Sequence, residues 1–371
     1  MKTKLFTILV VLLSTIFINQ TVFSQININT DKIKNKVTNN NSNKQKDKKV
    51  ELTKPSNIKN ENVLIAVGKP VYGQSQGCIY RSVDEGQTWT KVLSSFDYTP
   101  VSVAYGNELF VAISASKVAL SYTGEADTWT EVDISDTYVS SGSFDPQAIA
   151  FGNGFFVMCG GSGTLCYSKD GYNWKYIGEP DDMNVGVSHF KNIEFINGKF
   201  YVTGNCNRII TLVVKDDKVV KENAAKFSTD AGDYFSFVAK NNTNYITGRF
   251  SFYKSTDGTN WKQYEPSTSG SSKLIKVLNL ENNLYVGAKE MGGISVSKDN
   301  GNTLENANGI EADATYATHI KAMCIVGSKI VAIGHQTNIW VSTDGINWTS
   351  VANKDFEEIR FAGMVYSKIG K

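Results

Sequence analysis

The chain has 371 residues, with 38 lysines and arginines against 36 acidic residues and a formal net charge of +2 at pH 7. This balance lacks the basic excess that marks nucleic-acid-binding domains, so no nucleic-acid partner is expected. Residues 61–371 exceed the usual size of one hydrophobic core, so they should form either several domains or one repeat fold.

The first 24 residues are typical of a secretory signal peptide. Lys2 and Lys4 precede an uncharged apolar run over residues 5–18, and the small residue Ser24 stands at the expected cleavage site. The run is shorter than the roughly 20 apolar residues that span a bilayer. We therefore expect a secreted or envelope-associated protein that keeps no integral membrane segment after cleavage.

Residues 25–60 have a different composition, rich in Asn and Lys and without aromatic side chains. They carry nine lysines against three acidic residues. Such a segment buries too little apolar surface to offset its ordering entropy, so a disordered linker is expected. Two roles stay open for it: a solvated spacer, or a basic arm that holds the protein near an anionic envelope surface.

A short motif, Ser-x-Asp-Gly-x-x-Trp with variations, recurs along residues 61–371. Its best copies are 82–89, 168–174, 255–261 and 342–348; copy 297–304 ends in Leu, copy 121–129 lacks the Asp, and 215–218 keeps only an acidic turn. Successive markers are 40 to 46 residues apart. Units of roughly forty residues are typical of the four-stranded blades of a β-propeller.

Each unit contains short β-rich runs separated by Gly and Asn turns, for example 101–105, 109–113 and 118–121. Residues 61–67 resemble the second strand of a unit, so the first blade lacks an innermost strand, which residues 357–363 can supply. The prediction is an all-β, seven-bladed β-propeller of four-stranded blades over residues 61–371, with the ring closed by the C-terminal strand.

These motifs resemble the Asp-box, or bacterial neuraminidase repeat, of sialidase-like propellers. The resemblance implies that the box is a structural turn, in which Ser and Asp bond backbone amides and Trp packs between sheets. The residues that match are Asp84, Trp89, Asp170, Trp174, Asp257, Trp261, Asp299, Asp344 and Trp348. Because the box is structural, it predicts the fold and not the chemistry.

The same resemblance implies an alternative function, sialidase-like glycoside hydrolysis, with three arginines that grip a sugar carboxylate. The chain contains four arginines, Arg81, Arg208, Arg249 and Arg360. It departs from the family in two respects. The Arg-Ile-Pro start is missing, and seven units differ from the six blades of sialidases. We therefore favour a non-catalytic protein.

Aligning the innermost strands brings charged residues of neighbouring blades together near the axis. The alignment equates Lys321 with Lys276, and Arg360 with Glu194. The candidate ligand-binding residues are Lys276, Lys321, Arg360, Glu194 and Glu358. Propellers commonly bind ligands in a polar central pocket, but the same charges could instead form ion pairs that only fill the channel.

Other chemistry finds no support. His189, His319 and His335 are assigned to separate units without the spacing of a zinc site, so neither a metal nor a cofactor is expected. Cys159 and Cys166 flank one turn, and either a disulfide or two buried thiols fit.

The prediction is a secreted, monomeric, non-catalytic propeller that binds a glycan or a protein partner.

Overall fold

Strands and tight turns account for nearly all of the described chain in the computed structural model. The structure describes residues 50, 52–70, 76–96, 99–137, 145–177, 189–204, 208–226, 234–240, 243–248, 252–257, 260–264, 267–268, 274–280, 284–289, 292–310, 319–335, 338–351 and 359–370. Within these ranges no helix has the length and apolar character needed to cross a membrane. The predicted signal peptide and residues 25–49 lie outside the described residues and stay predictions.

The described strands form seven sheets. Six of them have four strands and one has five. The innermost strands are β29 (Ile359–Ile369), β4 (Ser102–Gly106), β8 (Pro146–Gly152), β12 (Phe190–Ile196), β16 (Tyr234–Lys240), β21 (Leu274–Asn279) and β25 (Ile320–Val326). The second strands are β1 (Glu61–Pro70), β5 (Leu109–Ile113), β9 (Phe155–Gly160), β13 (Lys199–Gly204), β17 (Thr243–Gly248), β22 (Tyr285–Lys289) and β26 (Lys329–Gly334).

The outer half of each sheet follows the same order. The third strands are β2 (Gly77–Ser82), β6 (Lys117–Ser121), β10 (Leu165–Ser168), β14 (Arg208–Lys215), β18 (Phe252–Ser255), β23 (Ile294–Ser297) and β27 (Ile339–Ser342). The fourth strands are β3 (Thr90–Phe96), β7 (Thr130–Asp133), β11 (Lys175–Tyr176), β15 (Lys218–Lys226), β19 (Lys262–Tyr264), β24 (Thr303–Asn306) and β28 (Thr349–Val351). The fifth strand β20 (Ser267–Thr268) pairs with β24 in parallel, and two 3-10 turns are η1 (Ser135–Thr137) and η2 (Gly161–Gly163).

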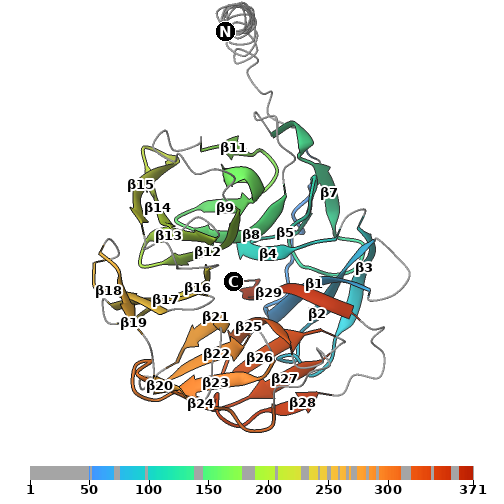
Figure 1. The fold of residues 1–371 in the computed structure, drawn as a ribbon. Helices are drawn as coiled ribbons and strands as arrows, with labels where there is room; N and C mark the ends of the chain where they lie inside the picture. Colours follow the sequence, from blue (N-terminus) through green and yellow to red (C-terminus); the bar gives the residue numbers. More distant parts are fainter. Residues whose placement is uncertain are drawn as a thin grey trace, which may run out of the picture. The chain divides into compact units, whose positions relative to one another are not determined.

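The innermost strands meet one another around a common axis (Figure 1). In the order β4, β8, β12, β16, β21, β25 and β29, each contacts the next, and β29 contacts β4. Sheets arranged radially in this way form a β-propeller, which confirms the predicted all-β propeller fold.

The strand nearest the C-terminus belongs to the same sheet as the first strand of the propeller. Strand β29 pairs antiparallel with β1 from Glu61 opposite Ile369 to Pro70 opposite Ile359, with one bulge beside Gly68. The hydroxyl of Tyr366 donates a hydrogen bond to the side-chain oxygen of Asn62 at 2.9 Å. Two segments about three hundred residues apart in sequence therefore form one pair of strands.

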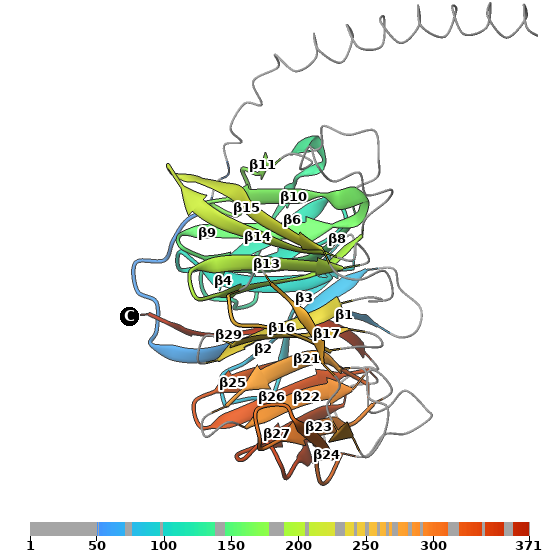
Figure 2. The same ribbon diagram turned by 60° about the vertical axis from the view of Figure 1, so that its left-hand side comes forward.

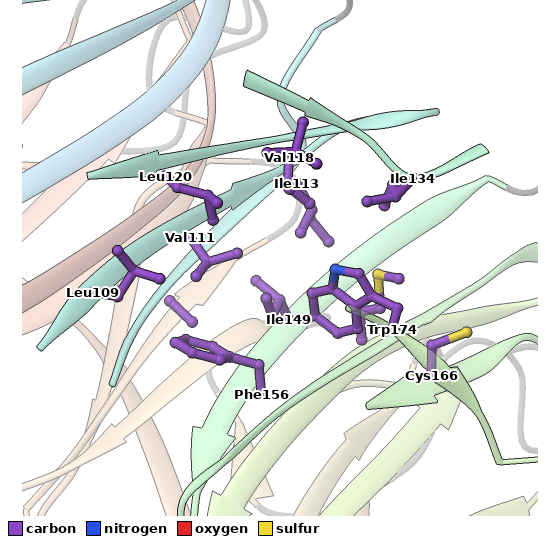
Figure 3. Packing of buried hydrophobic residues seen from close by; sticks show 13 residues of the cluster. Leu109, Val111, Ile113, Val118, Leu120, Ile134, Ile149, Phe156, Cys166 and Trp174 are labelled. Carbon is purple, nitrogen blue, oxygen red and sulfur yellow. The ribbon is translucent and has the colours of Figure 1, made fainter. Parts of the chain in front are cut away.

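The hydrophobic core is divided into layers, each lying between two neighbouring sheets. Figure 3 shows one layer, in which Leu109, Val111 and Leu120 of one sheet face Phe156 and Trp174 of the next. Further layers of buried side chains lie between other neighbouring sheets. Strands that are buried on both faces account for the nearly continuous apolar runs in the sequence, such as residues 109–113.

The recurring motif lies in the turn between the third and fourth strands, where its polar side chains bond to the backbone. The Ser hydroxyl accepts the backbone N–H of the Gly, and the Asp carboxylate accepts backbone N–H groups further along the turn. The Ser contacts are Gly86 N to Ser82 Oγ (3.0 Å), Gly171 N to Ser168 Oγ (3.0 Å), Gly301 N to Ser297 Oγ (2.8 Å) and Gly345 N to Ser342 Oγ (2.8 Å). The Asp contacts are Thr88 N to Asp84 (2.9 Å), Asn173 N to Asp170 (2.8 Å), Asn260 N to Asp257 (2.7 Å), Thr303 N to Asp299 (2.8 Å) and Asn347 N to Asp344 (2.7 Å). The boxes are therefore local, self-bonded turns, as Asp and Ser favour.

The tryptophans of the motif form hydrogen bonds to the same turns from the buried side. In four copies the indole Nε1–H donates to the carbonyl oxygen of the box glycine: Trp89 to Gly86 (3.0 Å), Trp174 to Gly171 (2.9 Å), Trp348 to Gly345 (3.0 Å) and Trp129 to Gly124 (3.3 Å). The first three of these rings are buried, whereas Trp129 and Trp261 are only half-buried. Where Leu304 replaces the tryptophan, the side chain is still buried.

We expect acid to weaken these turns, because their Asp carboxylates accept hydrogen bonds most strongly while ionised. Among them Asp344 should have the clearest effect on stability. Hydrogen bonds from the backbone N–H of Asn347, which outweigh the opposing effect of burial, lower the pKa of Asp344 to about 2 from an ordinary value of 3.8. A carboxylate with a lowered pKa stabilises the fold above about pH 4, and this contribution is lost as the pH falls towards 2. We expect the melting temperature to drop between pH 5 and pH 2.5, and to drop less steeply in Asp344→Asn.

The matched control for this pH series is Asp136→Asn, because Asp136 is an exposed carboxylate outside the motif. Its pH profile should follow that of the unmodified protein. If Asp344→Asn and Asp136→Asn gave the same profile, the box carboxylate would not be a source of the acid sensitivity.

Described residues that precede residue 61, the predicted start of the propeller, also pack against the sheets. The side chains of Val50 and Leu52 pack against the layer that contains Trp174, and Ile58 packs against the layer on the other side of β5. Lys54 Nζ bonds to Glu108 Oε2 at 2.5 Å. Residues 52–60 thus run along the sheets (Figure 2), because their few apolar side chains find partners there. The disordered linker remains a prediction for residues 25–49.

The two cysteines that flank one turn do not form a disulfide. Neither thiol takes part in a disulfide, and both side chains are buried. In the register of β9 and β10, Leu165 stands opposite Cys159 and Met158 opposite Cys166, so the two side chains point to opposite faces of the sheet. Each thiol packs in a different layer, which makes it an apolar filler, and burial raises the pKa of Cys166 to about 12.

Candidate functional site

A cavity of about 780 Å³, open to solvent, lies among the innermost strands of the propeller. Strands β4, β8, β12, β21, β25 and β29 contribute lining residues. The volume falls within the range of small-molecule and peptide-side-chain pockets in proteins. The cavity is therefore the candidate functional site.

A repeated irregularity at the start of the innermost strands positions side chains at one end of this cavity. In β8, β12, β21 and β25 the pairing with the second strand skips one residue near the start of the strand. A bulge leaves the skipped residue outside the ladder and can re-aim its side chain. The skipped residues are Gln147, Lys191, Ile275 and Lys321, and all four line the cavity.

This register corrects the sequence alignment of the innermost strands. Lys276 stands opposite Ala288, and the equivalent residue in β25 is Ala322 opposite Ile333, so Lys321 lies one position earlier than expected. In β29 the residue that follows the bulge, and is therefore equivalent to Lys276, is Gly363. The sequence alignment had placed Glu358, five positions earlier, at this point. The bulges are not visible in the sequence, and for this reason Gln147 and Lys191 were missed.

Two of the predicted site residues form an ion pair beside the cavity. Lys276 Nζ on β21 bonds to Glu194 Oε1 on β12 at 3.0 Å, although β16 lies between these strands in the ring. The amide of Asn192 donates a second hydrogen bond to the same carboxylate oxygen at 3.1 Å. Burial by itself would lower the pKa of Lys276, but the carboxylate of Glu194 outweighs it and raises the pKa above its ordinary value. Of the two roles that the sequence left open, ligand binding or ion pairing within the channel, Lys276 and Glu194 fit ion pairing better.

Lys321 and Arg360 lie at the end of the cavity where the strands begin, and both are exposed. Lys321 lines the cavity, whereas Arg360 precedes the lining residue Phe361. Glu358 lies outside the described residues. The four predicted residues that the structure describes are thus divided between an ion pair, Glu194 with Lys276, and a separate cationic end with Lys321 and Arg360.

Two histidines that sequence reasoning assigned to separate units lie together at this end, His319 just before β25 and His335 just after β26. The ring centroids of His319 and His335 are 5.9 Å apart, and the backbone N–H of His335 donates to the carbonyl oxygen of His319 at 3.0 Å. Burial, followed by the charges of Lys321, His319 and Arg360, lowers the pKa of His335 to about 4. Burial is the largest cause of this lowered pKa, and the positive charges of Lys321 and Arg360 add to it.

The arginines that the described residues include do not meet in one place. Arg81 on β2 bonds to Glu61 Oε2 at 2.6 Å and to the carbonyl oxygen of Thr123 at 3.2 Å. Arg208 lies on β14, a third strand, and only Arg360 is near the cavity. In the part of the chain that the structure describes, no group of three or more His, Cys, Asp or Glu residues could hold a metal ion.

The radial sheets and their central cavity define the chain as a β-propeller. A family model described as the DUF6242 beta propeller domain matches residues 183–316. No curated protein matches the chain.

Solved structures show the same fold at low sequence identity. A proposed 6-phosphogluconolactonase from Bacteroides fragilis has a TM-score of 0.59 at 12% identity, covering 85% of this chain and 100% of its own. YCF48 bound to D1 peptide has a TM-score of 0.52 at 12% identity, with 85% and 94% covered. Apo AztD from Citrobacter koseri has a TM-score of 0.55 at 10% identity, with 84% and 99% covered. These likenesses concern the fold alone.

Proposed function

We propose that the protein is an exported, non-catalytic propeller that binds a glycan or a protein partner at the central cavity. The observation that carries this proposal is a cavity of about 780 Å³ whose lining includes Lys191, Lys276 and Lys321. Polar groups converging on a concave, mostly apolar pocket are typical of ligand sites. YCF48, which has a similar fold, is bound to a peptide in its structure, so the fold is compatible with such a role.

The alternative, sialidase-like hydrolysis, receives less support from the described residues. A grip on a sugar carboxylate by three arginines requires the guanidinium groups to converge. Arg81 is instead engaged by Glu61 in an outer part of its sheet, and Arg208 lies on a third strand of another sheet. We therefore rank binding without turnover above hydrolysis.

We also infer that the ring has seven blades, that β29 closes it, and that the turns are Asp-boxes of the sialidase-like type. Support comes from the sheets of the described residues, the pairing of β29 with β1, and the bonds shared by the turns at Asp84, Asp170 and Asp344. Export rests on the signal-peptide pattern of residues 1–24. Protein recovered from the culture fluid or envelope fraction should begin at Gln25.

The binding proposal is tested with the mature protein on a glycan array, on immobilised envelope proteins and with fluorogenic sialosides. We expect saturable binding to one glycan or protein and no turnover of the sialosides. The variant Lys191→Gln removes one of the cavity lysines and should weaken that binding, whereas Lys329→Gln, on β26 and outside the cavity lining, should not. Turnover that persists through purification would contradict the non-catalytic assignment.

A further inference from the structure

One side of the central cavity is lined by polar side chains from three consecutive innermost strands. Strands β4, β8 and β12 are neighbours in the ring (Figure 1). They contribute Ser102, Gln147, Lys191 and Asn192 to the cavity lining, and each of these residues is partly exposed. A polar side chain that lines a cavity and keeps part of its surface accessible can bond to a ligand. We name these four residues the polar arc.

The charges at the start of β8 and β12 are connected by hydrogen bonds that pass through an amide group. Lys191 Nζ donates to Gln147 Oε1 at 3.4 Å. Gln147 Nε2 in turn donates to a carboxylate oxygen of Asp145 at 2.8 Å. This chain of hydrogen bonds therefore links one cation to one anion across two neighbouring sheets.

A second chain of the same kind begins one residue further along β12. Lys276 Nζ and Asn192 Nδ2 both donate to Glu194 Oε1, at 3.0 and 3.1 Å. Here too one lysine is matched by one carboxylate, with an amide beside them. A ligand at the polar arc thus meets charges that are already paired. Such a site favours a ligand without a charge of its own, because an ion placed there would lose hydration without gaining an unpaired partner.

The side chains of the polar arc keep hydrogen-bonding capacity for a ligand. A carboxamide has two N–H groups and an oxygen with two lone pairs. Asn192 uses one N–H toward Glu194, and Gln147 uses one N–H and one lone pair, so both amides keep donors and acceptors in the part of the chain that the structure describes. The hydroxyl of Ser102 accepts the backbone N–H of Ile149 at 3.4 Å and can still donate. Donors and acceptors therefore lie side by side along the polar arc.

Hydroxyl groups are the ligand chemistry that matches this arrangement. Each hydroxyl can donate one hydrogen bond and accept others at the same oxygen, so it can bond to a donor and an acceptor that lie side by side. A saccharide carries several hydroxyls on adjacent carbons without carrying a charge. The cavity of about 780 Å³ lies in the size range of pockets for such small molecules.

We propose that the central cavity binds a neutral saccharide, whose hydroxyl groups bond to Gln147, Lys191 and Asn192. This inference rests on the proposed function and deepens it, because it selects a glycan over a protein partner. It also selects an uncharged sugar over the acidic sugar that the sialidase resemblance implies. Lys321 and Arg360 belong to β25 and β29, outside the polar arc, and take no part in it.

Calorimetric titration of the mature protein with a matched set of probes tests the inference. Lactose and sialyllactose share one disaccharide and differ by an acidic sugar unit, whereas cellobiose, maltose and diacetylchitobiose vary the neutral sugar. A tripeptide of Ala, Ser and Gly with blocked ends represents a neutral peptide. We expect at least one neutral disaccharide to bind at least about tenfold more tightly than sialyllactose and the peptide. A tenfold rise in sodium chloride should change its Kd by less than about twofold, because the ligand has no charge to be screened.

Variants locate the sugar on the polar arc. Gln147→Leu and Asn192→Leu keep the approximate size of each side chain and remove its hydrogen bonds, so each should weaken binding of the neutral disaccharide about tenfold. Gln87→Leu is the matched control, because Gln87 is exposed in a box turn and does not line the cavity, and it should leave the Kd unchanged. The melting temperature of each variant verifies that it is folded.

Three results would overturn the inference. These are binding of sialyllactose or the peptide at least as tight as that of every neutral disaccharide, a steep loss of affinity with salt, and unchanged affinity in the Gln147→Leu, Asn192→Leu double variant. If the arrays found a protein or an acidic glycan whose binding weakened in Lys191→Gln, while no neutral sugar bound, the inference would fail and the proposed function would stand. Absence of every kind of binding, with both the sugars and the arrays, would reject the two together.

Discussion

Removal of residues 359–371 is expected to abolish cooperative folding of the whole propeller. The deletion takes away β29, which pairs with β1 along its entire length and buries Ile359, Phe361 and Ile369. It would expose the edge of β1, whose residues 63–67 are fully buried, and it would separate β25 from β4 in the ring of innermost strands. Because a domain of this kind is stable by only about 5–15 kcal/mol, the loss of a whole central strand exceeds what it can tolerate.

The measurement is thermal and urea unfolding followed by circular dichroism, with two controls. Tyr366→Phe removes only the 2.9 Å hydrogen bond to Asn62 and should cost about 1 kcal/mol. A synthetic peptide of residues 356–371, added in trans to the truncated chain, should restore the transition. A truncated protein that stayed soluble with the full melting temperature would show that β29 does not hold the ring together.

The fold could be predicted from sequence because its signature is local. Each box forms its own turn through contacts between residues that are close in sequence, such as Ser82 with Gly86 and Asp84 with Thr88, so its pattern can be recognised in single copies. The period between boxes then reports the size of a sheet. Even the C-terminal strand could be anticipated, because the first unit begins with what reads as a second strand.

The site was harder to predict because it depends on pairing between strands distant in sequence. A bulge of one residue moves Lys321 out of the position of Lys276, and nothing in the residues around Ile320 marks where the bulge falls. A one-residue shift changes which side of a strand a residue faces. The ion pair of Lys276 with Glu194 crosses an intervening strand, so no alignment of adjacent strands reveals it.

Trp174→Ala is expected to destabilise the propeller by about 3–5 kcal/mol, the range for truncating a buried aromatic residue. The ring is 1% exposed and lies between two sheets, beside Ile149 and Phe156 (Figure 3). Its indole N–H also holds the box turn through the carbonyl oxygen of Gly171 at 2.9 Å. Alanine would remove both the packing between the sheets and the hydrogen bond to the turn.

Two further variants divide this loss into its parts. Trp174→Phe keeps most of the apolar surface and removes the hydrogen bond, so it should cost about 1 kcal/mol for the bond and less than alanine overall. Trp261→Ala is the matched control, because that half-buried tryptophan occupies the same motif position and should cost less than Trp174→Ala. Urea unfolding at constant m-value measures all three. Equal losses at the two tryptophans would mean that the motif, and not burial between sheets, sets the contribution of each box to stability.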